Sequence, residues 1–239
     1  MKILALEFSS SHRSVAVAVL EPHAPPARAT RLAELHRAVR LSEVIDASRA
    51  STVQPFRMIE EALRQAELDR NQIECVAVGL GPGSYTGIRA AIAIAQGWQL
   101  ARGVKLTGVS SVLATAANAW DSGLRGRCSV IVDAQRNEFY LAGYELDEAG
   151  ATETEPLRLA SAEEVNRLAE AGRVLIGPDA HAYITNARAV YPSAAWIARL
   201  AAAQAEFVPG EKLEPIYLRE TSFVKAPPPR IRPDTEETT

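Results

Sequence analysis

The sequence repeats one plan twice, and this repeat constrains the fold more than any other feature. The run ILALEF is apolar except for the acid Glu7 next to its end, and the run SVIVDA has the same plan, with the acid Asp133 next to its end. Each is followed by a polar turn, SSSHR or QRNE, and then by a second strand-like run, SVAVAVL or FYLAGYEL. Continuous apolar runs of this length are typical of buried strands. Two such units predict duplicated α/β halves around a cleft.

Helix and strand patterns alternate after each pair of strands. The stretch 27–39 fits a strand or a helix, and its spacing does not decide between them. We predict helices opened by the capping box Ser161-x-x-Glu164 and by Ser193 as N-cap. The other expected elements are helices at 51–68, 87–101 and 111–120 and strands at 73–80, 104–109, 151–159 and RVLIG. The predicted domains are a first lobe at 1–110, a smaller lobe at 111–222 and a disordered, proline-rich tail at 223–239.

Composition gives no sign of a membrane or nucleic-acid protein. The 239 residues carry a net charge of −3, which does not favour polyanion binding by bulk electrostatics. No apolar run approaches the roughly 18 residues of a membrane span, and the start lacks a secretory pattern, so we expect a cytoplasmic protein. Cys75 and Cys128 are isolated within or beside strand-like runs, which favours buried reduced thiols.

The stretch GLGPGSYTGIR has the outline of a phosphate-binding loop but fits no standard one. A Walker loop requires a lysine that is absent here, and Thr86 replaces the third glycine of a dinucleotide fingerprint. Pro82 stands where a nucleophile elbow needs glycine. The helix N-terminus still offers backbone N–H groups to an anion, with Gly83, Ser84, Thr86 and Gly87 as weak candidates. The alternative, which we favour, is a tight strand-to-helix turn capped by Ser84 or Thr86.

Residues for catalysis are sparse. No two of the four histidines are three or four apart, so none forms the helical pair that binds zinc. Spacing does not support a triad of Ser84, His181 and Asp179. Glu7 and Asp133 are the best candidates for a catalytic carboxylate, because both are expected at strand ends that face a cleft. Acids at these positions of actin-like folds often hold a metal ion that is bound to phosphate. The alternative is that both side chains cap turns. We predict no catalytic residue and no metal.

The expected helix at 87–101 is apolar on both sides. Ile88, Ala91, Ile92, Ala95 and Trp98 form one side, and small residues with Ile94 form the other. A helix that is apolar all round is normally buried on both sides. The second side therefore packs either within the domain or on another chain.

Four motifs in order, GPGSYTGIRAAIAIAQG, GVSSV, IVDAQRNEFYLAGYE and EPIYLR, closely resemble the TsaB (YeaZ) family. The resemblance covers nearly the whole chain up to about Arg219. It implies the duplicated actin-like, sugar-kinase and Hsp70 (RNase H-like) fold, and a role in forming threonylcarbamoyladenosine next to the anticodon of tRNAs that read ANN codons. It also implies a non-catalytic relative of TsaD, in which Ser111 and Thr115 stand at the two metal-binding histidine positions, and hydroxyls are poor replacements for imidazole.

The same resemblance implies partners and an interface. The partners are TsaD in a heterodimer, TsaE through the TsaD complex, a second copy when the chain is alone, and tRNA only indirectly. The two helices implied to meet the partner contribute Met58 and then Ala90, Ala93, Ile94 and Gly97. The sequence departs from the family at Glu7-Phe8, where Asp-Thr is more usual, and in the longer stretch 28–50. We expect no cofactor. The alternative functions are a nucleotide phosphohydrolase or kinase using Glu7, Asp133 and the glycine loop, and a metallopeptidase.

Overall fold

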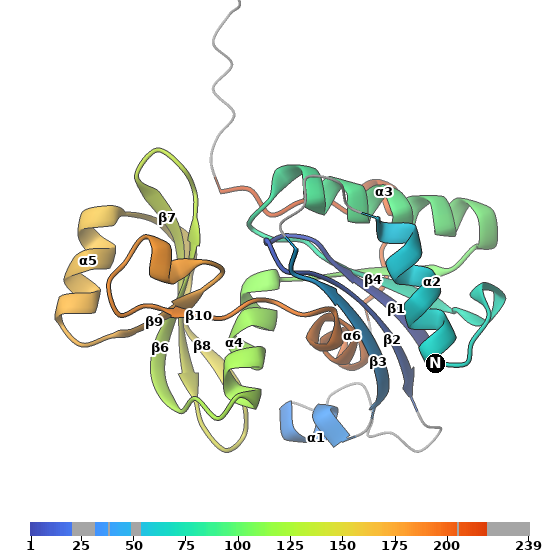
Figure 1. Ribbon diagram of the computed structural model, residues 1–239, viewed down its shortest axis with the longest axis horizontal. Coiled ribbons are helices and arrows are strands. Elements are labelled where there is room, and N and C mark those ends of the chain that lie inside the picture. Colours follow the sequence, from blue (N-terminus) through green and yellow to red (C-terminus); the bar gives the residue numbers. More distant parts are fainter. Residues whose placement is uncertain (21–31, 38, 49–53, 205, 219–239) are drawn as a thin grey trace, which may run out of the picture.

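Two five-stranded sheets of the same topology form the molecule (Figure 1). This computed structural model describes residues 1–20, 32–37, 39–48, 54–204 and 206–218. The first sheet contains, in spatial order, β3 (Val39–Asp46), β2 (Arg13–Leu20), β1 (Lys2–Glu7), β4 (Cys75–Gly79) and β5 (Lys105–Val109). The second contains β8 (Ala151–Ser161), β7 (Glu138–Leu146), β6 (Gly126–Asp133), β9 (Val174–Gly177) and β10 (Arg188–Ala189) in the same order.

Strand directions repeat as well. In each sheet the first three strands along the chain pair antiparallel with one another, and the last two strands add in parallel. The duplication expected from the sequence is therefore confirmed, with β6 and β7 repeating the roles of β1 and β2. This is the two-lobed α/β fold of the actin-like, sugar-kinase and Hsp70 group.

Helices form layers around the two sheets (Figure 1). On one face of the first sheet, α2 (Pro55–Gln65) packs on β2 and β3, and α3 (Tyr85–Arg102) packs on β1, β4 and β5. The other face is covered by α6 (Ala194–Ala203), which also contacts α4 (Ser111–Asp121) and the short α1 (Leu32–Arg37). The second sheet contacts α4 and, through β7 and β8, α5 (Ala162–Glu170). The described residues also contain the short 3₁₀ helices η1 (Arg70–Gln72), η2 (Ala180–Ala182) and η3 (Gly210–Lys212).

The largest apolar core lies between the sheets. It joins residues of β1, β2 and β4 to residues of α4, α6, β6 and β7. At its centre Trp120 of α4 meets Trp196 of α6 edge-on, with ring centroids 6.1 Å apart. A second core lies under α2 and α3, and a third lies under α5. The central core holds the two lobes together because both sheets share it.

The chain returns to the first sheet after the second. The hydroxyl of Ser14 in β2 accepts a hydrogen bond from the N–H of Ala194 at 2.7 Å, and Glu43 in β3 accepts one from Ala195 at 3.0 Å. Beyond α6, Val208 and Ile216 donate backbone bonds to Leu106 and Leu80. The domain limits 1–110 and 111–222 thus stay a proposal, in which 194–218 belongs to the second lobe by sequence and packs on the first. The predicted tail lies outside the described residues.

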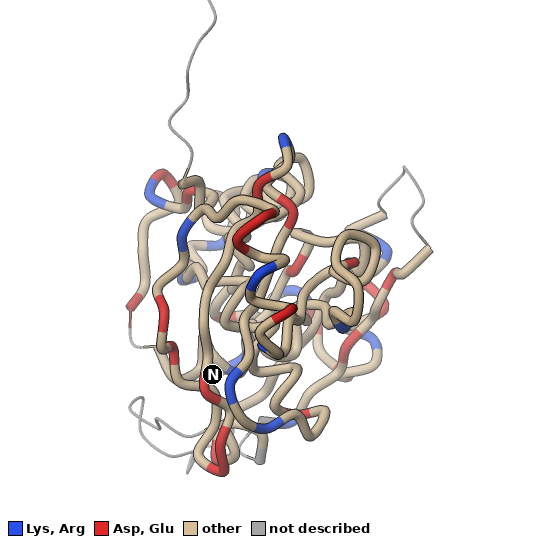
Figure 2. Tube along the Cα trace, turned by 90° about the vertical axis from the view of Figure 1, so that its left-hand side faces the viewer, with Lys and Arg blue, Asp and Glu red and all other residues tan. Residues whose placement is uncertain are grey.

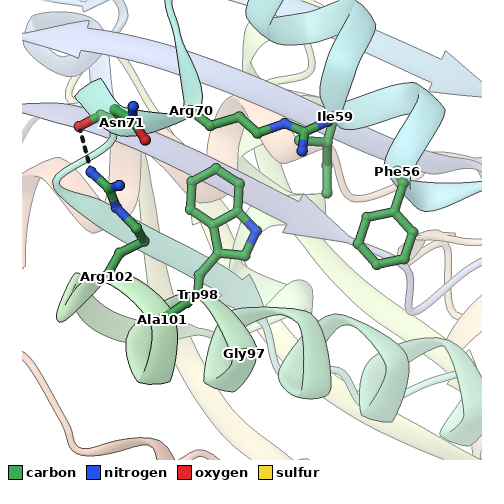
Figure 3. Close-up of a pocket in the computed structure, with 8 residues that line it drawn as sticks. All are labelled: Phe56, Ile59, Arg70, Asn71, Gly97, Trp98, Ala101 and Arg102. Atoms are coloured by element: carbon green, nitrogen blue, oxygen red, sulfur yellow. Dashed lines mark hydrogen bonds between the residues drawn. The ribbon is translucent and has the colours of Figure 1, made fainter.

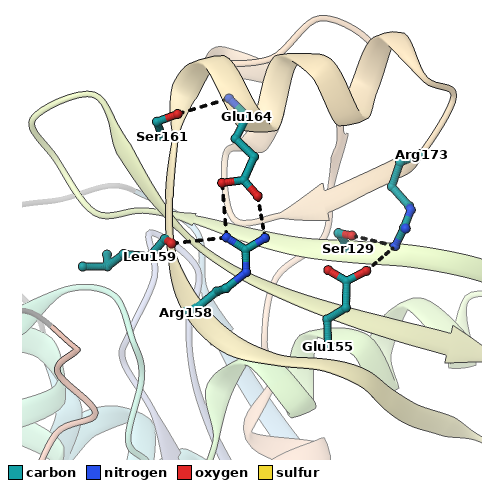
Figure 4. A network of polar contacts seen from close by, with 7 residues as sticks. All are labelled: Ser129, Glu155, Arg158, Leu159, Ser161, Glu164 and Arg173. Atoms are coloured by element: carbon teal, nitrogen blue, oxygen red, sulfur yellow. Dashed lines mark hydrogen bonds and ion pairs between the residues drawn. The ribbon is translucent and has the colours of Figure 1, made fainter.

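Most predicted elements are present, with differences at the edges. The ambiguous stretch 27–39 contains α1 in its described part, while β3 and β10 were not anticipated. Ser193 caps α6 and Ser161 caps α5 as expected, by accepting from Trp196 and Glu164. The Glu164 carboxylate accepts two hydrogen bonds from Arg158 of β8 and none from the backbone of Ser161, so only the Ser161 half of the predicted capping box forms (Figure 4).

Candidate functional site

The glycine loop folds tightly against the turn that follows β1. Gly81 and Gly83 both have positive φ, at 83° and 152°. A Cβ added at Gly83 would lie 2.2 Å from the carbonyl oxygen of Ser9, so only glycine fits there. The N–H of Ser84 donates to that same carbonyl at 2.7 Å. The protein's own backbone therefore fills the space beneath this loop.

The start of α3 is closed in the same way. The Ser84 hydroxyl accepts from the N–H of Gly87, which makes Ser84 the N-cap. A Cβ on Gly87 would stand 2.0 Å from the carbonyl oxygen of Phe8. Two N–H groups that an anion would need, those of Ser84 and Gly87, are thus bonded within the protein. Thr86 is exposed and lines the cleft between the lobes.

Glu7 does not face a cleft, contrary to expectation. Its side chain is fully buried, and its Oε1 accepts from the N–H of Ser9 at 2.7 Å. Its Oε2 accepts from the hydroxyl of Ser111 at 2.7 Å, and that hydroxyl accepts in turn from the N–H of Gly81. Burial raises the pKa of Glu7, and the hydrogen bonds from Ser9 and Ser111 oppose this effect. The carboxylate joins β1, the glycine loop and α4, and so it has a structural position.

Ser111 and Thr115, which the family resemblance places at metal-binding positions, also make hydrogen bonds within the protein. Ser111 donates to Glu7, and the Thr115 hydroxyl donates to the carbonyl of Ser111 at 2.8 Å. Both residues are buried. Within the described part of the chain, no three His, Cys, Asp or Glu side chains are grouped as metal ligands would be.

A polar cleft of about 500 Å³ lies between the lobes. The first lobe contributes Ser84, Tyr85 and the turn of Ser9–Ser11, and the second contributes Asp133 and Asp179. Asp133 therefore lines the cleft as expected, with its Oδ1 accepting from the N–H of Gln135 at 2.7 Å. The Asp179 carboxylate accepts from Ser11 and Tyr191. His181 lies in η2 and is exposed.

Part of the exposed side of α3 is apolar and lies beside the exposed residues Arg89 and Gln96. Ala93 and Gly97 are exposed, Ala90 and Ile94 are half-buried, and Leu100 is 91% exposed. A Cβ on Gly97 would meet no atom within 4 Å, so another surface can approach the helix backbone closely here. We call the five residues Ala90, Ala93, Ile94, Gly97 and Leu100 the α3 stripe.

A groove between α2 and α3 extends this stripe (Figure 3). Phe56 of α2 is 64% exposed at one end of the groove, and Trp98 lies across from it. Arg102 at the other end donates to the carbonyl of Asn71. Met58 does not belong to this surface, because its side chain is 6% exposed and packs in the core under α2. The groove has a volume of about 220 Å³ and is lined by Phe56, Ile59, Arg70, Asn71, Gly97, Trp98, Ala101 and Arg102.

Neither the distribution of charged residues nor the two cysteines indicates a further site. In the view of Figure 2, basic and acidic residues are interspersed along the chain. Cys75 and Cys128 are buried free thiols, as expected, and burial raises their pKa values to about 12 and about 11. None of the helices among the described residues has the length and apolar character needed to cross a membrane.

Comparison with known proteins identifies related sequences. The family described as "TsaD: tRNA N6-adenosine threonylcarbamoyltransferase" matches residues 45–205. The tRNA threonylcarbamoyladenosine biosynthesis protein TsaB of Escherichia coli is 37% identical over 39% of this chain, a match that spans 40% of that protein. TsaB of Haemophilus influenzae is 27% identical over 76% of this chain and 85% of its own length.

Solved structures agree with the fold. YeaZ from Pseudomonas aeruginosa superposes with a TM-score of 0.68 at 22% identity, covering 91% of this chain and 99% of that one. A second Pseudomonas aeruginosa structure, of a protein similar to peptidase YeaZ, gives a TM-score of 0.70 with the same coverage. At this identity the two structures support the fold alone.

Proposed function

Since the chain belongs to the TsaB (YeaZ) family, related to TsaD, we propose that it serves tRNA threonylcarbamoyladenosine biosynthesis as a docking subunit. In this role it binds TsaD, supports TsaE through the TsaD complex and meets tRNA only indirectly. The transfer chemistry belongs to TsaD. A cytoplasmic location goes with this role.

The α3 stripe is the observation that carries the proposal. Its small residues let a partner helix approach closely, and Leu100 and Phe56 offer large exposed apolar side chains beside it. Contiguous exposed apolar surface of this kind marks protein interfaces. The groove of Figure 3 gives a partner side chain a recess next to the stripe.

The bonding of the polar residues supports a non-catalytic role. Glu7 is sealed in the core, the glycine loop is closed by the Ser9 carbonyl, and Ser111 bonds to Glu7. Groups that would hold a phosphate or a metal in a related enzyme thus stabilise the fold here. A catalytic group needs access to substrate, which Glu7 does not have.

A mixing experiment with purified TsaD tests the docking role. We expect the parent chain and TsaD to co-elute in size-exclusion chromatography. Gly97→Glu places a charge on the α3 stripe and should abolish the complex, while Asn166→Glu on the exposed side of α5 is the matched control and should retain it. A complex that survives Gly97→Glu contradicts this interface. Elution of the chain alone shows whether a second copy occupies the stripe when TsaD is absent.

The cleft favours one second candidate, a nucleotide phosphohydrolase or kinase. Its volume of about 500 Å³ and the presence of Asp133 are compatible with a small ligand. This candidate predicts magnesium-dependent nucleotide turnover by the isolated chain, lost in Asp133→Asn. Absence of turnover in the pure parent protein rejects it.

A further inference from the structure

Both oxygens of the Asp179 carboxylate accept hydrogen bonds, and one of these bonds connects the two lobes. The hydroxyl of Ser11, in the turn between β1 and β2, donates to Oδ2 at 2.8 Å. The hydroxyl of Tyr191, just before α6, donates to Oδ1 at 2.8 Å. Hydrogen bonds to a charged carboxylate are stronger than those between neutral groups. Since Ser11 and Asp179 line opposite sides of the cleft, the first of these bonds spans it.

Tyr191 makes two further contacts at the same place. Its ring stacks on the imidazole of His12, with centroids 3.5 Å apart and planes 10° from parallel. Its carbonyl accepts from the side-chain amide of Asn118 in α4 at 2.9 Å. Tyr191 belongs to the segment that carries the chain from the second sheet back to α6. Through Tyr191, the segment that joins the second sheet to α6 therefore contacts both the turn between β1 and β2 and helix α4.

Asp179 holds an uncommon backbone conformation in this arrangement. Its φ is 53°, in the left-handed region that aspartate adopts at a modest cost in free energy. That conformation directs the carboxylate toward Ser11 and Tyr191 at once. Two-lobed proteins joined by short crossing segments commonly change the angle between their lobes as rigid bodies. Here the side chains of Ser11, His12, Asp179 and Tyr191 contact one another beside the cleft.

We propose that Ser11, His12, Asp179 and Tyr191 form an interlobe latch that, together with the shared core, fixes the angle between the two sheets. When the latch is removed, the second lobe turns about the segment before α6 and about the β5–α4 junction. The latch is independent of the proposed docking role, since none of its residues lies on the α3 stripe. Loss of each hydrogen bond to Asp179 shifts the ratio of latched to open molecules by about tenfold.

Pulsed EPR distances between the lobes test the latch. Spin labels are attached at Gln65→Cys on α2 and Asn166→Cys on α5, two exposed positions. The buried native thiols, with raised pKa values, stay unlabelled. We expect one narrow distance distribution in the parent and a broader one with a second population in Asp179→Ala. An unchanged distribution in folded Asp179→Ala overturns the proposal.

Two further variants make the result specific. Asp133→Ala removes a second carboxylate of the cleft whose bond to Gln135 stays within its own lobe, so its distribution should match the parent. If Asp133→Ala broadens the distance distribution as much as Asp179→Ala does, the effect is common to cleft mutations and the latch is rejected. Ser11→Ala removes only the hydroxyl that bonds to Asp179 across the cleft. If Asp179→Ala fails to fold, Ser11→Ala decides: a second population supports the latch, and the parent distribution rejects it.

Discussion

The carboxyl group of Glu7 lies in an environment very different from that of an exposed carboxylate, because it is fully buried. Its burial raises its pKa above the ordinary value of 4.5. Between pH 4.5 and the pKa of Glu7 in the folded protein, Glu7 is protonated to a greater extent in the folded protein than in the unfolded chain. The free energy of unfolding that Glu7 contributes is therefore fully present below pH 4.5 and is lost as pH rises through the folded pKa.

The variant Glu7→Gln should remove this pH dependence. We expect the free energy of unfolding of the variant, minus that of the parent, to increase as pH rises and to become constant above the pKa of Glu7 in the folded protein. Urea denaturation from pH 4 upward measures this difference. Any constant offset from the altered bonds to Ser9 and Ser111 does not affect this trend. Glu170→Gln on the surface of α5 is the control. A difference between Glu7→Gln and parent that is constant with pH contradicts the raised pKa.

Two glycines allow a matched test of packing. A Cβ at Gly79 would stand 1.9 Å from Glu7 Oε2, whereas a Cβ at Gly97 meets nothing within 4 Å. Gly79→Ala should destabilise the fold by about 1–3 kcal/mol through overpacking. Gly97→Ala should stabilise it by about 0.5–1 kcal/mol, because alanine loses less backbone entropy in a helix. Urea denaturation measures both, and equal effects would show that Gly79 is not constrained by Glu7.

At the scale of single residues, the sequence gives the type of each side chain but does not show whether that side chain points into the core or toward solvent. Glu7 and Asp133 end equivalent strands, yet one is sealed in the core and the other lines the cleft. Met58 and Phe56 lie two positions apart on α2, and only Phe56 is exposed. These differences depend on what packs over each strand or helix, and the packing partners come from distant parts of the chain.

Helix α6 is the element on which the arrangement of the lobes depends. Its residues are nearly all buried, because it packs on the first sheet and on α4 at once. Its N-terminus is held by Ser193 within the local chain and by Ser14 and Glu43 from the first sheet. Burial raises the pKa of Glu43, with the Ala195 N–H and Ser14 opposing it.

Removing the Ser14 hydroxyl should weaken this attachment. Ser14→Ala leaves the N–H of Ala194 buried without its acceptor, so we expect a loss of about 1–3 kcal/mol in the free energy of unfolding. The control is Ser122→Ala, which removes an exposed hydroxyl at the end of α4. Equal stabilities of the two variants in thermal denaturation would contradict the role of Ser14.

Periodicity and capping signals predict a helix or strand well when the residues that determine it are close together in the sequence. The helix after Pro192 and its cap Ser193 follow from the sequence, whereas its place on the first sheet does not, since Ser14 and Glu43 lie some 150 positions earlier or more. The strand β3 was missed because its sequence, VRLSEVID, mixes polar and apolar residues as an edge strand does. The two-residue β10 carries no periodic signal at all.

The whole molecule combines a duplicated scaffold with one open apolar face. The two sheets share a core through α4 and α6, and the polar groups of Glu7, Ser111 and Thr115 are bonded within the protein. The α3 stripe and the groove beside it face outward from this scaffold (Figure 3). Duplication and family could be read from sequence motifs, while the closure of the glycine loop by Ser9 required the structure.

Photo-crosslinking from Leu100 to TsaD tests the docking role most directly. Leu100 is 91% exposed on the α3 stripe, so an aromatic photoreactive residue can replace it without disturbing the core. On irradiation of the mixture, we predict a covalent product between TsaD and the chain labelled at position 100, and none when the same group replaces the exposed Asn166 of α5. A product from position 166 with none from position 100 would contradict the assignment of α3 as the surface that binds the partner.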